Sequence, residues 1–237
     1  MDIQTLRGYG VAASDAESGW DDAFKVRIKK TAQKVIMGHL TFSQKIKVLY
    51  WFIKEKKRAA ALDLSDLRAK GMNNQAFLKQ QLEYISLFSA LLKVRGKDNA
   101  LKIMYDVMDK TASEALLLSL PEVKDMKKAG EPFEVFRNFF TSYPNAAKKA
   151  GCHDIRVSEN TEQVLQFDVQ WCVWLELAKK MNVPEACLPN CYADDLAYPD
   201  YFSALGIKYS RTGTLAKGCQ TCDFRFEKMK DKTALNR

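Results

Sequence analysis

Six cysteines carry the strongest chemical signal in this sequence, because all of them follow residue 150. The first 151 residues contain none, and the six are Cys152, Cys172, Cys187, Cys191, Cys219 and Cys222. The use of cysteine as a small core residue does not explain such a bias. A thiolate is both a nucleophile and a metal ligand. The sequence therefore indicates that the chemistry of this chain lies in its C-terminal part.

Strand-like alternation predicts that Cys222 and Arg211 both point into the protein. In the predicted strand 221–228, Cys222 shares a face with phenylalanine rings, and in 206–215 Arg211 shares a face with apolar residues. An inward guanidinium needs an anionic partner to offset its lost hydration. The candidates are a thiolate, Asp194, Asp195 or an anionic ligand. Either Arg211 lowers the pKa of a nearby thiol and makes it a nucleophile, or an Arg–Asp pair only holds two strands together.

Two pairs of cysteines and the histidine His153 are further candidates for metal binding or catalysis. The pairs with spacings suited to zinc are Cys187 with Cys191 and Cys219 with Cys222. His39 and His153 are the only histidines, so a His-rich metal site and a Ser-His-Asp triad are both poorly supplied. His153 directly follows Cys152 at the start of a predicted strand. A histidine at a strand entrance is more often only partly exposed, and a Cys–His catalytic pair is the alternative.

The elements that must position these groups change in kind near residue 150. Before it, apolar residues recur at helical spacing, and helix ends are marked by Thr41 with Gln44, by Asn73 or Asn74, by Gly96 and by Pro132. After it, the pattern predicts a hairpin up to 163–172, helices at 173–182 and 192–204, and strands at 206–215 and 221–228. In 163–172, Val169 and Trp171 fall on one face and Cys172 on the other.

We therefore expect an α+β fold, in which an N-terminal helical bundle or cap precedes a small antiparallel sheet with flanking helices. The predicted divisions are a loosely ordered start, 1–18, a helical region, 19–150, an α+β domain, 151–229, and a C-terminal tail, 230–237. The chain has 237 residues, of which 47% are hydrophobic and 28% charged. These values exclude collagen-like, coiled-coil and wholly disordered proteins.

The expected location follows from what the sequence lacks. It contains no run of about 18 apolar residues, so we expect no membrane span. Its first 20 residues lack the apolar stretch of a secretory signal. We therefore expect a cytoplasmic protein in which the cysteines are reduced.

The positive charge is concentrated in one block. The net charge is +8, and residues 25–58 hold eleven Lys or Arg residues and one acid, Glu55. Apolar residues recur through this block at near-helical spacing, which predicts two amphipathic helices with a solvated basic face. An acidic partner, a membrane surface or a nucleic acid is the alternative use of such a face. No DNA or RNA motif is present, so we expect no nucleic-acid partner.

The stretch GIKYSRTGTLAKGCQTCDFRF, residues 206–226, resembles the closing signature of the L-2-amino-thiazoline-4-carboxylic acid hydrolase family. The matching positions are Arg211, Thr214, Leu215, Ala216, Gly218, Cys222, Asp223 and Phe224. Upstream, FDVQWC places Cys172 and NCYADD places Cys191 and Asp194. The resemblance spans about 165–226 and implies a hydrolase-like domain that opens a cyclic amidine-like ring.

The favoured function is therefore a hydrolase with cysteine-based catalysis, acting on a non-peptide C–N bond of a small cyclic amidine- or amide-like substrate. Cys222 or Cys191 would attack the substrate carbon, and Asp194 would move protons. Arg211, Cys172 and Asp223 would bind the substrate, and no cofactor would be needed.

Two alternatives remain. In the first, Cys172, Cys191 and Cys222 bind zinc, which delivers hydroxide. In the second, the same residues line the pocket of a non-catalytic small-molecule sensor or carrier. A homo-oligomer is compatible with each function. All three functions require Arg211 and Cys222 to lie beside one another in the folded chain.

Overall fold

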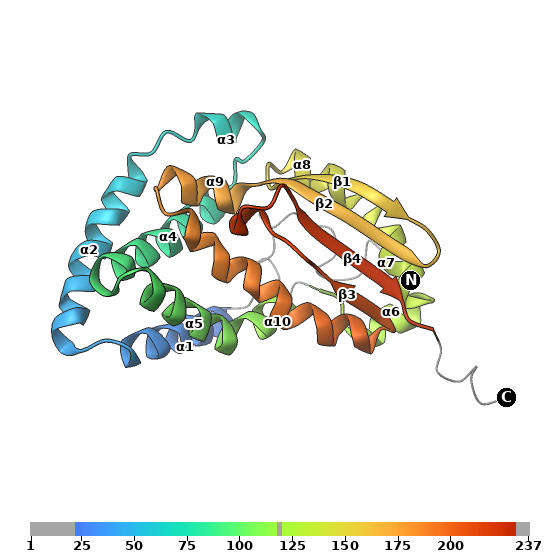
Figure 1. Cartoon of the computed structure of the whole chain (residues 1–237), viewed down its shortest axis with the longest axis horizontal. Coiled ribbons are helices and arrows are strands. Elements are labelled where there is room, and N and C mark those ends of the chain that lie inside the picture. Colours follow the sequence, from blue (N-terminus) through green and yellow to red (C-terminus); the bar gives the residue numbers. More distant parts are fainter. Residues whose placement is uncertain (1–21, 118–119, 231–237) are drawn as a thin grey trace.

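A computed structural model describes residues 22–117 and 120–230, and Figure 1 shows their arrangement. Helices from the first half of the chain gather at one end, and a small sheet lies at the other. The predicted loose start, 1–18, and the predicted tail from residue 231 onward lie outside the described residues.

Among the described residues, eight helices precede the sheet: α1 (Asp22–Gly38), α2 (Phe42–Ala60), α3 (Ser65–Ala69), α4 (Gln75–Arg95), α5 (Lys97–Leu117), α6 (Val123–Ala129), α7 (Pro132–Phe140) and α8 (Tyr143–Lys149). Their ends follow the local signals. The Thr41 side chain accepts a hydrogen bond from the Gln44 backbone N–H, and the Gln44 side chain accepts one from the Thr41 backbone N–H. These two bonds confirm the predicted capping box. Asn74 caps α4, Gly96 ends it, and a proline opens α7. In the described ranges, no helix is long and apolar enough to cross a bilayer.

The sheet confirms the predicted fold class. Its strands are β1 (His153–Asn160), β2 (Val164–Cys172), β3 (Ile207–Ser210) and β4 (Cys222–Lys228), all antiparallel and in the order β1-β2-β4-β3. Between β2 and β3 lie α9 (Val173–Lys180), the short 3-10 helix η3 (Pro184–Cys187) and α10 (Leu188–Ala204). A second 3-10 turn, η4 (Leu215–Lys217), precedes β4.

The predicted strand 206–215 is too long, because β3 ends at Ser210. The backbone N–H groups of Thr212 and Gly213 donate to the Asp223 carboxylate, at 3.0 and 2.6 Å. Those N–H groups are therefore unavailable for strand pairing, and the chain leaves the sheet as a loop. Arg211 lies at the start of this loop instead of within a strand.

A one-residue irregularity in β2 reverses the predicted facing of its last residues. Ile155 pairs with Val169, whereas its neighbour Asp154 pairs with Trp171, so Gln170 is extra on its strand. Such a bulge moves every later side chain to the opposite face. Cys172 therefore shares the face of Val169, and Trp171 does not, contrary to the simple alternation of the sequence.

Two hydrophobic cores meet at the end of β2. One is built by α2, α4, α5 and α9, and the other by the sheet with α6, α7 and α10. Cys172 and Leu215 pack against both cores. The helices α6 and α7 thus contribute to the core of the sheet, while α9 packs into the helical core. The division of the chain near residue 150 stays a prediction.

The loop after α3 packs tightly against the turn between α8 and β1, and Gly151 makes this possible. Its φ is +66°, and an added Cβ would overlap the backbone of Gly71 and Met72. Gly218 also has a positive φ, +87°, but an added Cβ there would meet nothing within 4 Å. A side chain at Gly151 would therefore cause both backbone strain and overlap, whereas a side chain at Gly218 would cause backbone strain alone.

We predict that Gly151→Ala lowers the free energy of unfolding by about 3 kcal/mol, because backbone strain and overlap add together. Gly218→Ala carries the strain alone and should cost about 1 kcal/mol. Urea denaturation of both variants measures the difference. Equal losses in the two variants would show that residues 71–72 and 151 do not pack as described.

Candidate active site

Cys172 lies where three structural elements meet. It ends β2, it is the N-cap residue of α9, and it is directly opposite His153 at the start of β1. Cys187 ends η3, and Cys191 follows one turn later in α10. Side-chain hydrogen bonding joins the thiol of Cys187 to those of both Cys172 and Cys191. Within the described residues, the six cysteines form no disulfide bond.

The surroundings of Cys172 favour its thiolate. The hydrogen bond from Cys187 and the neighbouring His153 imidazole together lower the pKa of Cys172 well below the ordinary range of a thiol, although burial opposes them. The Leu175 amide in the first turn of α9 acts in the same direction, as expected at the positive end of a helix. The same contact raises the pKa of Cys187, so Cys187 keeps its own proton and can donate it in a hydrogen bond to the Cys172 thiolate.

The surroundings of Cys222 shift its pKa in the opposite direction. It lies in β4 opposite Val169, is buried, and accepts a hydrogen bond from the Leu215 backbone N–H at 3.2 Å. Burial raises its pKa to about 12, and Arg211 opposes that shift only in part. Cys222 is therefore a thiol at neutral pH.

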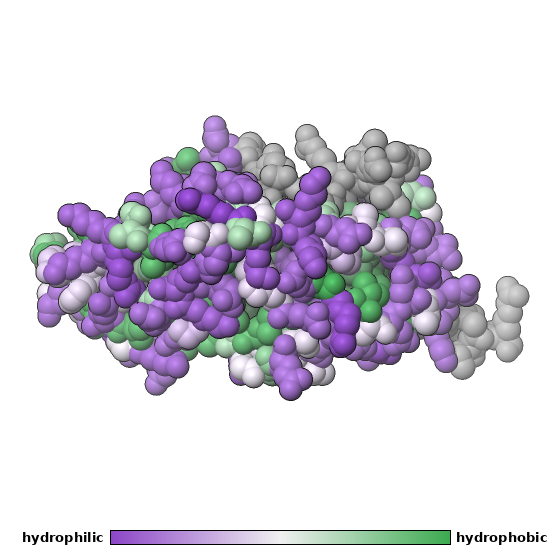
Figure 2. Space-filling model, turned by 90° about the horizontal axis from the view of Figure 1, so that it is seen from above, coloured by the Kyte–Doolittle hydropathy of each residue, from purple (hydrophilic) through white to green (hydrophobic). Residues whose placement is uncertain are grey.

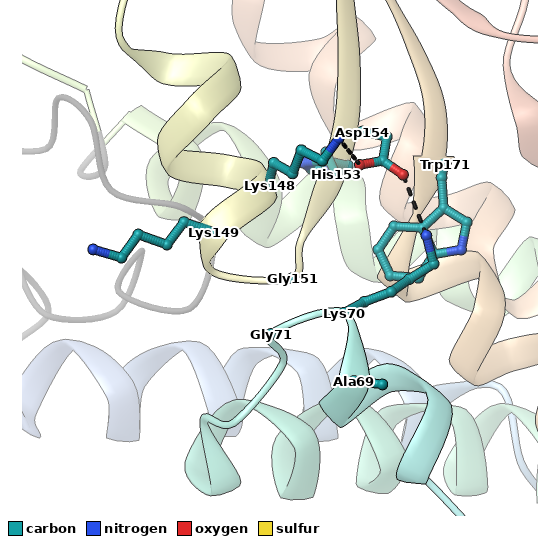
Figure 3. Close-up of a pocket in the computed structure, with 9 residues that line it drawn as sticks. All are labelled: Ala69, Lys70, Gly71, Lys148, Lys149, Gly151, His153, Asp154 and Trp171. Carbon is teal, nitrogen blue, oxygen red and sulfur yellow. Dashed lines mark hydrogen bonds and ion pairs between the residues drawn. The ribbon is translucent and has the colours of Figure 1, made fainter.

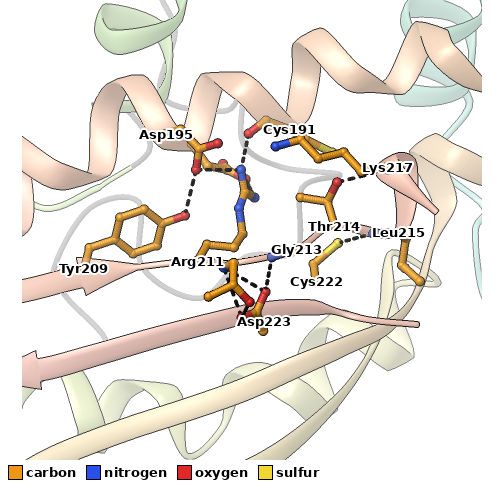
Figure 4. Close-up of polar contacts among 12 residues, drawn as sticks. Cys191, Asp195, Tyr209, Arg211, Gly213, Thr214, Leu215, Lys217, Cys222 and Asp223 are labelled. Carbon is orange, nitrogen blue, oxygen red and sulfur yellow. Dashed lines mark hydrogen bonds and ion pairs between the residues drawn. The ribbon is translucent and has the colours of Figure 1, made fainter. Parts of the chain in front are cut away.

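Arg211 is held by α10 (Figure 4). Its side chain is only 3% exposed and donates to Asp194 Oδ2 at 2.9 Å and Asp195 Oδ1 at 2.7 Å. It also donates to the main-chain carbonyl of Cys191, and its guanidinium lies over the Phe224 ring at 5.0 Å. The inward direction predicted for Arg211 is confirmed. Its partners are the two predicted aspartates, and they join a helix to the loop after β3 instead of joining two strands.

Asp194 is the titratable carboxyl of this group. Loss of hydration on burial raises its pKa to about 6, although the charge and hydrogen bond of Arg211 lower it in part. The charge of His153 also acts on Asp194, as it does on Cys172. A carboxyl that titrates near neutral pH can both give and accept a proton.

Asp223 holds the loop that carries Arg211. Its carboxylate accepts the backbone N–H groups of Thr212 and Gly213 and the Thr212 hydroxyl. These hydrogen bonds lower the pKa of Asp223, although burial opposes them. The predicted role of Asp223 in substrate binding stays a prediction.

Five of the predicted residues thus lie in one neighbourhood: Cys172, Cys191, Cys222, Asp194 and Arg211. His153 is the partner of Cys172 rather than of Cys152, a pairing that the sequence analysis missed. The correct strand register of the hairpin would have revealed this pairing, because His153 lies opposite Cys172 on the neighbouring strand. The spacing of Cys187 and Cys191 marked them as a pair, but nothing in the sequence indicated that Cys187 also contacts Cys172.

A pocket of about 470 Å³ opens beside His153 (Figure 3). Lys70, Lys148 and Lys149 line it with Asp154 and Trp171. Lys70 Nζ lies 3.3 Å from Asp154 Oδ2 and 4.7 Å from the centre of the Trp171 ring. Lys70 and Lys148 both pair with Asp154, whereas the Lys149 side chain points away from these residues (Figure 3). Two cations and one anion leave the pocket with a net positive charge, which suits an anionic small molecule. The sequence analysis did not single out these lysines.

The zinc alternative needs three ligands at coordinating distance. Within the part of the chain that the structure describes, no group of three His, Cys, Asp or Glu side chains is arranged to hold a metal ion. This includes the set of Cys172, Cys191 and Cys222.

We predict that Arg211→Lys lowers the free energy of unfolding by about 2–3 kcal/mol, because one ammonium cannot satisfy three acceptors in a buried site. Arg225→Lys is the matched control. Arg225 also donates to three acceptors, Glu159, Gln166 and Glu227, but its side chain is 34% exposed. Its replacement should cost less than about 1 kcal/mol. Equal effects in urea denaturation would show that the Arg211 contacts are not buried.

Comparisons with known proteins give one result. Searches of curated proteins and of solved structures found no significant match. A family model matches residues 75–226, well over half of the chain, and it begins at α4, upstream of the resemblance seen in the sequence. The chain therefore belongs to the L-2-amino-thiazoline-4-carboxylic acid hydrolase family.

Proposed function

We propose that this protein hydrolyses a C–N bond in a small, cyclic amidine- or amide-like carboxylate, with Cys172 as its nucleophile. The observation that carries the proposal is the environment of Cys172, which combines a histidine, a thiol donor and a helix N-terminus around one sulfur. The sequence favoured Cys222 or Cys191 for this role. We prefer Cys172 because burial keeps the Cys222 thiol protonated.

The proposed reaction has two steps. The Cys172 thiolate attacks the electrophilic ring carbon, and the electron pair of the breaking C–N bond goes to nitrogen, which takes a proton from Asp194. Water then attacks the carbon bound to sulfur, gives one proton to the Asp194 carboxylate and releases the thiolate. His153, which is hydrogen-bonded to Cys172, stabilises the thiolate between turnovers.

The substrate's carboxylate is assigned to the positive pocket. The family name denotes a carboxylic acid as substrate, and the exposed Lys148 lies with Lys70 at the pocket beside His153 (Figure 3). Arg211 and Asp223 were the predicted binding residues, but each already has several protein partners. We therefore give these two residues a positioning role.

Replacing the nucleophile should abolish turnover. With L-2-amino-thiazoline-4-carboxylic acid as the probe, we predict that Cys172→Ser lowers kcat by about 1,000-fold or more. Cys219→Ser, at an exposed cysteine, is the matched control and should keep full activity. Product formation by chromatography measures both.

Two results would refute this assignment. Full activity of Cys172→Ser is one. The other is a rise in melting temperature with the probe while the probe is not consumed, which indicates the sensor or carrier instead.

The pH profile tests the role of Asp194. Its protonated form must supply the proton, and its pKa is about 6, so kcat should fall as the pH rises through that value. The pKa of the Cys172 thiol is lowered well below the ordinary range, so its ionisation opposes this fall less than that of an ordinary thiol would. Asp194→Asn should remove this pH dependence and lower kcat by about 100-fold or more. Asp195→Asn changes the other carboxylate bound to Arg211, whose side chain is 40% exposed, and should keep the profile. An unchanged profile in Asp194→Asn would rule out this proton donor.

A further inference from the structure

The outer face of α2 carries a stripe of large apolar side chains. They are between 49% and 79% exposed: Phe42, Ile46, Leu49, Tyr50 and Ile53. Their spacing places them on one side of the helix, and the opposite side buries Val48, Glu55 and Ala59. The sequence pattern favoured a buried apolar stripe and a solvated basic face, whereas the structure leaves this stripe facing outward.

Positive charge flanks the stripe on both sides. With about 100° of rotation for each residue, Lys45 and Lys56 fall on one flank, and Lys47 and Lys54 fall on the other. The one acid of α2, Glu55, is buried and is bound by Arg58 and Lys93, at 2.7 and 3.0 Å. The exposed part of this helix therefore presents cations and apolar groups together.

The position of α2 suits contact with an extended surface. It forms the outer edge of the helical end of the molecule, away from the sheet (Figure 1). Hydrophobic side chains appear among hydrophilic ones at that end in Figure 2. The neighbouring helix α1 adds the exposed cations Lys29, Lys30 and Lys34, and the exposed side chain of Val26.

We propose that α2 docks this protein on the surface of an anionic lipid bilayer. The helix lies in the plane of the interface, with its apolar stripe at the boundary of the acyl chains and its lysines among the headgroups. A second copy of the chain fits this face poorly, because pairing two such helices would bring the lysines of one against the lysines of the other. Anionic headgroups complement the same charges.

Sedimentation of the whole chain with vesicles tests this. We expect binding to vesicles of phosphatidylcholine with phosphatidylserine, weaker binding to phosphatidylcholine alone, and loss of binding as salt rises. The double variant Leu49→Ser and Ile53→Ser should bind anionic vesicles at least about tenfold more weakly. The double variant Lys45→Gln and Lys47→Gln should lose about tenfold as well.

Two controls distinguish a loss of vesicle binding through α2 from misfolding and from nonspecific hydrophobic adsorption. Val157→Ser removes another exposed apolar side chain, 40% exposed on β1, and should bind like the wild type. All variants should keep the wild-type melting temperature, because the changed side chains are exposed, except for Lys45, which is half-buried.

Three outcomes would overturn the proposal. One is equal binding of all variants to the vesicles. Another is a dimer in sedimentation velocity that Leu49→Ser abolishes while vesicles are not bound. The last is capture of an acidic protein by the wild type, lost in Leu49→Ser, without binding to vesicles.

Discussion

The Arg211 guanidinium holds together parts of the chain that lie far apart in sequence. Burying a guanidinium costs several kcal/mol unless well-placed acceptors surround it, and here α10 supplies two carboxylates and a main-chain carbonyl. The loop that carries Arg211 is in turn fixed to β4 through the Asp223 carboxylate. Movement of α10 away from the sheet would leave a buried cation unpaired. This constraint sets the position of Asp194 relative to the thiols.

A bulge in β2 completes the arrangement. The extra residue, Gln170, turns Cys172 toward the face of Val169 and Cys222, at the point where the two cores meet. There Cys172 also caps α9 and faces His153. The hydrogen bonds from Cys187 and His153 favour ionisation of the buried Cys172 sulfur, whereas Cys222 lacks these partners and keeps its proton. One fold thus shifts the pKa values of two cysteines in opposite directions, which is how a chain with several thiols can use one of them as a nucleophile.

Local signals in the sequence predicted most of the fold, and long-range geometry accounts for what they missed. The capping box at Thr41 and the end of α4 at Gly96 depend on residues a few positions apart, so they could be predicted directly. The bulge at Gln170 has no signature in a single sequence, and it reversed the facing of Cys172. The early end of β3 depends on Asp223, which lies in another strand. The aspartate partners of Arg211 could be foreseen because an inward guanidinium needs an anion, whereas the pairing of His153 with Cys172 required the strand register.

The pKa of the Cys172 thiol tests most directly whether this cluster makes a nucleophile. A thiolate absorbs ultraviolet light more strongly than a thiol, so the titration of the wild type minus that of Cys172→Ser isolates this one group. We predict that the midpoint of the difference lies well below the ordinary thiol value of about 8.5. A midpoint at or above that value would contradict the role of Cys172 as the nucleophile.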